Sequence, residues 1–372
     1  MAESELQEPD RIDGVPHPRE TFQLIGQDAA QTAFLDAFNG GRIHHAWLLT
    51  GPRGVGKATL AWNIARFLLA TPNPDGDSLF GAAPPAQTLD ISADHPVARR
   101  IASGAEAGLK PITRTVNEKT GRLRKEIVVD DIRNLAGFFQ LSATEGGRRV
   151  VIIDSADELN TAAANALLKM LEEPPARAVL LLISHQPSRL LPTIRSRCRT
   201  LRLNTLPPEQ MAAALMQAGI DESSGAIALS ELAAGSVGEA IRLVKLDGLK
   251  IYAEIIALLG SLPQLDRARA LALAEAAAQR GAEEKLELLL TLFDVALARL
   301  ARAGASGQAA PEAAPNEAQI FARLAPHPMQ ARNWADAAQS AMARARHGRA
   351  VNLDPAALVL DTLFKLRDTA NT

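Results

Sequence analysis

A glycine-rich loop, Gly51-Pro-Arg-Gly-Val-Gly-Lys57, constrains the fold of this chain more than any other stretch. The run before it, Ala46-Trp-Leu-Leu-Thr50, predicts a buried strand, and the run after it, from Ala58 to Leu69, predicts an amphipathic helix. Such a loop between a strand and a helix binds phosphate, because its backbone N–H groups point inward at the positive end of the helix. We therefore predict a nucleotide-phosphate site made of Gly51, Pro52, Arg53, Gly54, Val55, Gly56 and Lys57.

The loop departs from the usual motif at the residue after the lysine. That position normally carries Ser or Thr, whose hydroxyl holds Mg²⁺, and this chain has Ala58. Thr59 comes one position later and points about 100° away on a helix. The sequence therefore predicts a phosphate loop with an impaired grip on metal. It leaves open whether the loop holds ATP or ADP without hydrolysing it.

A carboxylate follows the apolar run Arg149–Ile153, which predicts a second buried strand. Asp154 has the usual place of the residue that orients Mg²⁺ in phosphate-loop enzymes. The next residue is Ser155, and a hydroxyl cannot act as a carboxylate base at neutral pH. Asp157 and Glu158 come after the strand end, so we predict that they are solvated capping residues.

The two halves of the chain differ in pattern. Strands alternate with helices up to about residue 205, which predicts an α/β layer with a parallel sheet, whereas only helical periodicity follows Pro207-Pro208. Within the first half, we predict a strand pair at 111–116 and 126–129 around a basic turn, for which a solvated hairpin tip is favoured over a contact with a phosphate backbone. The predicted division is a flexible arm (1–20), an α/β domain (21–205) with a weakly patterned insertion (71–125), a small helical domain (206–247) and a helical bundle (248–372).

Composition excludes several classes of protein. The 40 basic residues nearly balance the 42 acidic ones, which argues against a protein that coats nucleic acid by bulk charge. Cys198 is the sole cysteine, so an internal disulfide and a multi-cysteine zinc site are excluded, and we expect it to be a buried apolar residue. No apolar run reaches the length of a membrane span, and no secretory start is visible. We expect a cytoplasmic protein without membrane contacts.

Arginines crowd the segment that follows the apolar run Ala178–Ser184. A solvated basic turn is one interpretation. In the other, one guanidinium is presented to the γ-phosphate of a nucleotide bound by a neighbouring chain, where such a group can accelerate hydrolysis by about 10³–10⁵. The arginines are Arg189, Arg195, Arg197, Arg199 and Arg202.

Three further motifs carry a resemblance to a known family. With the phosphate loop, the stretches starting at His45 (His-Ala-Trp-Leu-Leu-Thr-Gly-Pro), Asn165 (Asn-Ala-Leu-Leu-Lys-Met-Leu-Glu-Glu-Pro-Pro) and Ser196 (Ser-Arg-Cys) resemble bacterial clamp-loader subunits of the AAA+ class. Together they span most of the first 200 residues, and the last two motifs are highly specific in combination. The resemblance implies an AAA+ phosphate-loop domain, a helical lid at 206–247 and a helical collar at 248–372 that joins subunits in a five-membered ring.

Within that family the defects resemble those of the delta-prime type of DNA polymerase III subunit. Ala58 replaces the metal-binding hydroxyl, Ser155 replaces the catalytic glutamate, and Gly238 stands where ATPase subunits place an arginine. The intact Ser-Arg-Cys motif implies that Arg197 acts in trans on the ATP of a neighbouring motor subunit, and Ser184 is the sensor-like residue.

The resemblance also implies partners and an alternative. The partners are the gamma/tau motor subunits and the delta subunit in a hetero-pentameric ring, with the sliding β-clamp and primer–template DNA reached through the complex. The chain itself is then not a competent ATPase and needs no cofactor. The alternative is an active gamma/tau-like ATPase, favoured by Lys57 and Asp154. Many relatives carry a four-cysteine zinc module between these two residues, but 71–125 has no cysteine, so no metal is expected.

Overall fold

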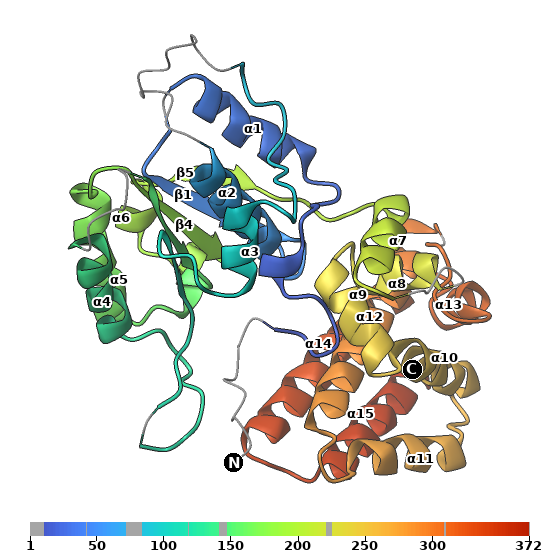
Figure 1. The fold of residues 1–372 in the computed structure, drawn as a ribbon. Helices are drawn as coiled ribbons and strands as arrows, with labels where there is room; N and C mark the ends of the chain where they lie inside the picture. Colours follow the sequence, from blue (N-terminus) through green and yellow to red (C-terminus); the bar gives the residue numbers. More distant parts are fainter. Residues whose placement is uncertain are drawn as a thin grey trace. The chain divides into compact units, whose positions relative to one another are not determined.

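A computed structural model describes residues 11–41, 43–71, 84–117, 119–140, 147–220, 225–308 and 310–371 of the chain. It divides into two compact units, seen in Figure 1. The first comprises residues 1–206 with 217–219, and the second comprises 207–216 with 220–372. The proposed boundary between a lid and a collar, at 247/248, stays a prediction.

Parallel strands build the first unit, which confirms the predicted α/β class. Within the described residues the sheet has five strands in the order β2-β3-β4-β1-β5. Leu48 of β1 lies opposite Leu182 of β4 on one side and Thr200 of β5 on the other. The phosphate loop therefore leaves the sheet from an inner strand. The strands are β1 (Ala46–Thr50), β2 (Leu109–Ile112), β3 (Arg149–Ile153), β4 (Ala178–Ser184) and β5 (Arg199–Arg202).

Both faces of the sheet are covered, which explains why its inner strands read as unbroken apolar runs. Alternate residues of β1 enter two different hydrophobic clusters, Trp47 and Leu49 in one and Ala46 and Leu48 in the other. The first cluster includes residues of α1, α2 and α3, and the second includes residues of α4 and α5 (Figure 1). These helices are α1 (Asp28–Asn39), α2 (Lys57–Ala70), α3 (Pro96–Ala102), α4 (Val129–Gln140) and α5 (Thr161–Glu172).

The segment between α2 and α4 differs from its prediction. The strand pair at 111–116 and 126–129 is wrong, because β2 pairs in parallel with β3 and residue 129 already begins α4. Of the predicted hairpin, the described residues retain an antiparallel bridge between Val116 and Leu123. Part of 71–125 is therefore integral to the sheet, since α3 and β2 supply the buried residues Ile101 and Leu109 to its core.

The predicted flexible arm ends before residue 20. Residues 1–10 lie outside the described part of the chain. His17 is 2% exposed and stacks edge-on against Trp62 of α2, with ring centroids 5.8 Å apart. Buried Arg66 donates a hydrogen bond to the backbone carbonyl of Arg19 at 2.7 Å. These contacts fix the last residues of the supposed arm against α2.

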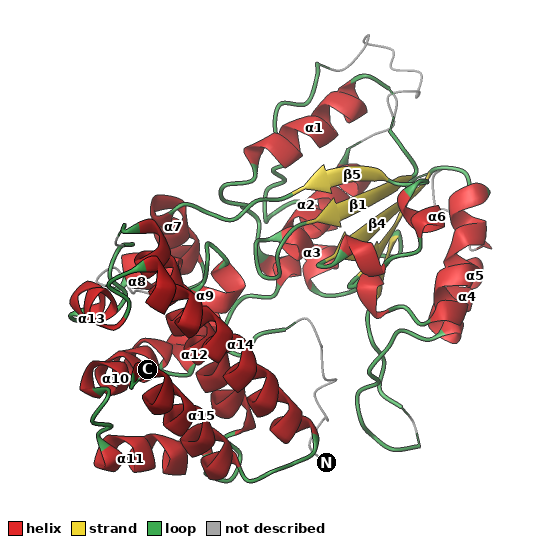
Figure 2. Ribbon diagram, turned by 180° about the vertical axis from the view of Figure 1, so that it is seen from behind, coloured by secondary structure: helices red, strands yellow, loops and turns green. Residues whose placement is uncertain are grey.

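The second unit is all-helical, as predicted from its periodicity. In Figure 2, α12 and α14 lie side by side, and α14 also packs against α15. Within the described residues, no helix is both long and apolar enough to cross a membrane. The helices are α7 (Pro208–Gln217), α8 (Ala226–Leu232), α9 (Val237–Lys245), α10 (Gly248–Ser261), α11 (Arg267–Ala277), α12 (Glu283–Ser306), α13 (Glu317–Leu324), α14 (Pro328–Ala350) and α15 (Pro355–Ala370).

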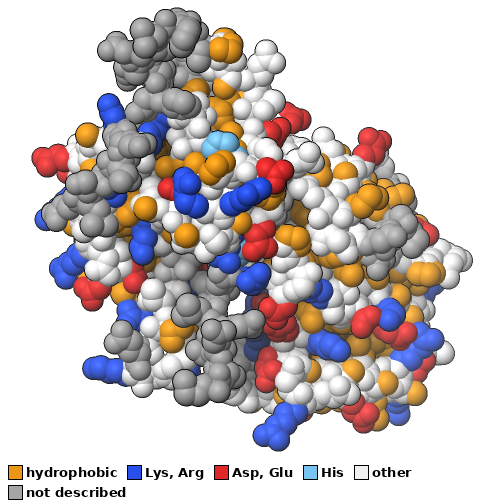
Figure 3. Space-filling view, in the orientation of Figure 1, with side chains coloured by type: hydrophobic (Ala, Val, Ile, Leu, Met, Phe, Trp, Pro, Cys, Tyr) orange, Lys and Arg blue, Asp and Glu red, His pale blue; other side chains and the backbone are white. Residues whose placement is uncertain are grey.

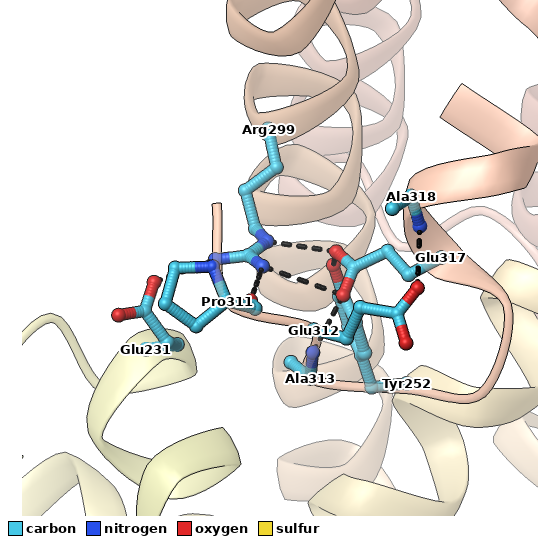
Figure 4. A network of polar contacts seen from close by, with 8 residues as sticks. All are labelled: Glu231, Tyr252, Arg299, Pro311, Glu312, Ala313, Glu317 and Ala318. Carbon is cyan, nitrogen blue, oxygen red and sulfur yellow. Dashed lines mark hydrogen bonds and ion pairs between the residues drawn. The ribbon is translucent and has the colours of Figure 1, made fainter. Parts of the chain in front are cut away.

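A buried ion pair joins several helices of the second unit (Figure 4). Arg299 of α12 and Glu317 of α13 lie 2.8 Å apart, with side chains only 8% and 2% exposed. Tyr252 of α10 donates a hydrogen bond to Glu317 at 2.6 Å, and Glu231 of α8 pairs with Arg299 at 2.9 Å. Burial opposes the charge of Arg299, but its bonds to Glu317 still raise its pKa above the ordinary value. The network therefore ties α8, α10, α12 and α13 together.

Candidate functional site

The phosphate loop owes its shape to its glycines. Gly51, Gly54 and Gly56 all have positive φ, at 147°, 76° and 97°, which side chains disfavour. A Cβ on Gly51 would lie 2.5 Å from the carbonyl oxygen of Leu203, and one on Gly56 would lie 2.7 Å from a methyl group of Leu24. The loop therefore folds in the wrapped form that the motif predicts, pressed between the residue after β5 and the segment before α1.

The side chain of Gln27 fixes the phosphate loop by hydrogen bonds, although no sequence motif marks this residue. Its buried side-chain amide donates to the carbonyl of Val55 at 3.1 Å and to that of Asn204 at 2.8 Å. Its carbonyl oxygen accepts the N–H of Asn204 at 3.1 Å. One side chain thus satisfies three backbone groups from two segments. The only local signal for this is a polar residue just before α1.

Lys57 is folded back into the loop. Its ammonium group donates to the carbonyl of Gly51 at 2.7 Å and also to that of Pro52, and the residue is 3% exposed. Burial lowers the pKa of Lys57 to about 8, while the carboxylates of Asp154 and Asp157 act in the opposite direction. The structure therefore brings Lys57 and Asp154 near each other, two residues that the sequence predicts for the nucleotide site.

The prediction that Asp157 is a solvated capping residue is wrong. Its carboxylate accepts the hydroxyl of Ser184 at 2.7 Å, the backbone N–H of His185, and that of Gln186 at 3.2 Å. Ser184, the predicted sensor-like residue, is fully buried at the end of β4. Because three donors converge on one carboxylate, the turns that follow β3 and β4 are locked to each other. The missed signal is that both turns leave the same edge of the sheet.

His185 joins this cluster although no motif marked it. Burial, together with the nearby charge of Lys57, lowers its pKa to about 4. Its Nδ1 atom is buried and has no hydrogen-bond partner among the residues that the structure describes. The imidazole is therefore neutral near physiological pH, and it lies beside the ammonium that the loop would offer to a phosphate.

Three positions carry residues other than those expected of an active ATPase of the resembled family. Ala58 presents a methyl group in the first turn of α2, packed against the hydrophobic cluster on that face of the sheet. Ser155 is 4% exposed, and its hydroxyl is buried without a partner in the described structure. Gly238 lies in the first turn of α9, in the second unit, and has no side chain to offer. The loop therefore fits a phosphate group, whereas the metal-binding position does not fit Mg²⁺.

Arg197 lies on the surface between the short helix α6 (Pro192–Arg195) and β5. Its guanidinium donates to the carbonyl of Thr193 at 3.0 Å and pairs with Glu172 at 2.8 Å, with 36% of the side chain exposed. Arg195 is exposed, whereas Arg199 lies over the ring of Trp47 at 5.1 Å. The predicted basic segment thus contains arginines in different surroundings.

Cys198 follows Arg197 but is not a reactive thiol. It packs against the second hydrophobic cluster, and burial raises the pKa of its thiol to about 12. A thiol of this kind stays protonated at neutral pH and is a poor nucleophile. Among the described residues, no group of histidine, cysteine or acidic side chains could hold a metal ion.

Known proteins match the first unit. Residues 26–207 match the family model described as "DNA polymerase III, delta subunit". The chain is 44% identical over 161 residues to the DNA polymerase III subunit delta' of Pseudomonas aeruginosa, a match that covers 43% of each protein. It is 34% identical over 212 residues to the subunit of the same name from Escherichia coli, covering 57% of this chain and 58% of that one. The chain thus spans about half the length of these curated relatives.

Other relatives have different names. DNA polymerase III subunit gamma/tau of Mycobacterium bovis is 32% identical over 217 residues, which cover 56% of this chain and 32% of that protein. The crystal structure of a gamma subunit-related protein from Thermotoga maritima aligns with 91% of this chain and 99% of its own, at a TM-score of 0.43 and 18% identity.

Proposed function

We propose that this chain is a clamp-loader subunit of the delta-prime type in DNA replication, because residues 26–207 match the family model and two DNA polymerase III delta' subunits are similar in sequence. One observation carries this proposal: the first unit keeps a well-formed phosphate loop without the groups for hydrolysis, and it exposes Arg197 close to the same sheet. A subunit that serves a neighbour's ATP site needs an exposed arginine. It does not need the groups that hydrolyse ATP in its own loop.

The proposed mechanism assigns Arg197 a role in trans. Its guanidinium contacts the γ-phosphate of ATP bound by the adjacent motor subunit and stabilises the charge on the transferred group. The phosphate loop of this chain serves as a rigid part of the domain, because Lys57, Gln27 and Asp157 all form hydrogen bonds with other groups of the chain. Hydrolysis in the neighbouring site then helps to load the sliding β-clamp on primed DNA.

The proposed partners follow from the resemblance of the motifs to those of bacterial clamp-loader subunits. They are gamma/tau motor subunits and a delta subunit in a hetero-pentameric ring, with the β-clamp and primer–template DNA reached through the assembled complex. Matches to both delta' and gamma/tau subunits support a place among such proteins. We also propose that the loop binds ATP or ADP without turnover, which equilibrium binding of a labelled nucleotide to the isolated chain would test.

Replacing Arg197 with alanine tests the proposed function. In a reconstituted clamp loader, we expect Arg197→Ala to lower DNA-stimulated ATP hydrolysis by about tenfold or more, because an arginine finger contributes several orders of magnitude to one site. Arg195→Ala is the matched control, since Arg195 is exposed two residues earlier in the same segment. Full ATP hydrolysis and clamp loading with Arg197→Ala would overturn the proposal.

An active ATPase of the gamma/tau type is the second candidate. The intact Lys57 beside Asp154 favours it, whereas Ala58 and Ser155 oppose it. Hydrolysis of ATP by the purified chain, lost in Lys57→Ala, would establish this alternative. Negligible hydrolysis by the isolated chain, together with the effect of Arg197→Ala in the complex, would exclude it.

A further inference from the structure

The ion pair between Arg197 and Glu172 gives the proposed finger an intramolecular partner. Arg197 Nη2 lies 2.8 Å from Glu172 Oε1, and Arg197 Nη1 donates to the carbonyl of Thr193 at 3.0 Å. Both terminal nitrogens of the guanidinium therefore already donate to acceptors of their own chain. A phosphate that is bound in the bidentate manner uses two such N–H groups side by side. Contact with a neighbour's phosphate therefore competes with these bonds.

The position of Glu172 strengthens its hold on the arginine. Glu172 is the last residue of α5, where the exposed carbonyl groups of a helix carry partial negative charge. A second carboxylate, that of Glu173, follows at once. A cation is favoured at this end of the helix, and an incoming phosphate is repelled by it. Arg197 must therefore turn away from the end of α5 before it can reach an anion elsewhere.

We propose that Glu172 is a positioning residue that holds Arg197 in reserve until a neighbouring subunit presents its nucleotide. The inference rests on the proposed function, because it assumes that Arg197 acts in trans. The side chain of Glu172 is 51% exposed, and that of Arg197 is 36% exposed. Exposed ion pairs contribute little, corresponding to a factor of up to about five in an equilibrium constant. The hold is therefore weak enough for a fully charged phosphate to replace it.

Removing the charge of Glu172 tests the reserve role. In the reconstituted loader, with β-clamp and primed DNA, we expect Glu172→Gln to raise kcat/KM for ATP by about two- to fivefold, because the arginine no longer has to leave a carboxylate. The gain should shrink toward onefold near 1 M salt, where the Debye length is about 3 Å. A purely structural role would not show this loss with salt.

Two control variants separate this idea from simpler ones. Glu173→Gln removes an adjacent exposed carboxylate that forms no ion pair within the described structure, so it should leave kcat/KM unchanged. The double variant Glu172→Gln/Arg197→Ala should match Arg197→Ala alone, since the effect must pass through the arginine.

The outcomes distinguish the two proposals. If Arg197→Ala leaves hydrolysis intact, the proposed function fails and the reserve role fails with it. If Arg197→Ala lowers hydrolysis but Glu172→Gln does not raise kcat/KM, or raises it equally in the Arg197→Ala background, the reserve role alone is overturned.

Discussion

Two ion pairs of equal length occur in very different surroundings. Arg299 and Glu317 in the second unit, and Arg197 and Glu172 in the first, are each separated by 2.8 Å. The first pair is 8% and 2% exposed, and the second is 36% and 51% exposed. Equal distances therefore conceal unequal energies, because the surroundings decide what happens when one partner leaves.

The number of other partners also separates the two pairs. Tyr252, Glu231, the carbonyl of Pro311 and the backbone N–H of Ala313 also bond to the buried pair (Figure 4). Water can replace either member of the exposed pair. Charged side chains of both signs are interspersed over the face shown in Figure 3. Burial thus makes one arginine a structural residue and leaves the other free to exchange.

The largest expected effect follows from breaking the buried pair. Glu317→Gln leaves the charge of Arg299 without its main carboxylate, so we expect the free energy of unfolding to fall by about 3–5 kcal/mol. Chemical denaturation, followed by a probe of helix content, measures this change. Glu172→Gln is the matched control, because it makes the same substitution in a pair of the same length.

If Glu317→Gln lowered the free energy of unfolding by less than about 1 kcal/mol, the buried and the exposed ion pair would not differ as proposed. It would mean that Glu231 alone compensates Arg299. The double variant Glu231→Gln/Glu317→Gln would then lose far more stability than the two single variants together, and this excess would locate the compensation.

An intermediate effect is expected from pH at His185. Its pKa of about 4 in the folded chain lies below the ordinary value of 6.5, so the unfolded chain binds the proton first as the pH falls. Stability from this group is complete above pH 6.5 and is lost between 6.5 and about 4. From about pH 7.5 to about pH 5, we expect a loss of about 1–2 kcal/mol, which His185→Gln should lack.

The charge of Lys57 provides an internal check on this assignment. Because that charge contributes to the low pKa of His185, Lys57→Met should raise the pKa toward its ordinary value. The acid-induced loss of stability in Lys57→Met should then be smaller than in the unaltered chain. Identical pH profiles of the unaltered chain and His185→Gln would show that other groups cause the loss.

The smallest expected effect concerns the stability of the exposed pair. Arg197→Ala and Glu172→Gln should each change the free energy of unfolding by less than about 1 kcal/mol, because water solvates the remaining partner. The same denaturation measurement that detects the loss in Glu317→Gln tests this. A larger loss for either variant would make the pair structural and would remove the basis for a mobile arginine.

Much of the fold could be predicted because its signals are local. Unbroken apolar runs marked β1, β3 and β4, and the glycines marked the loop after β1. The helices of the second unit followed from their periodicity. The edge strand β2 was misplaced, because Leu109–Ile112 contains a proline and buries only its two end residues. Only its pairing with β3 makes this segment a strand.

The site was less predictable than the fold, because its contacts join distant segments. Lys57 and Asp154 could be placed together, since the carboxyl ends of parallel strands share an edge. The contact of Gln27 with Asn204 spans 177 positions, and that of Asp157 with Ser184 spans 27. Neither residue belongs to a repeating pattern, so only the folded backbone shows what each one holds.

The hydrogen bonds of Gln27 help to explain why the glycines of the phosphate loop are retained. The side-chain amide of Gln27 holds the loop backbone at Val55, and Leu203 packs against Gly51. The glycines are therefore required for packing even where no phosphate is cleaved. A substitution such as Gly51→Ala would then appear as a protein that fails to accumulate in cells, and not as a folded protein with a slow reaction. A phosphate-loop signature can thus outlast its chemistry, because the architecture built around it continues to select for the same residues.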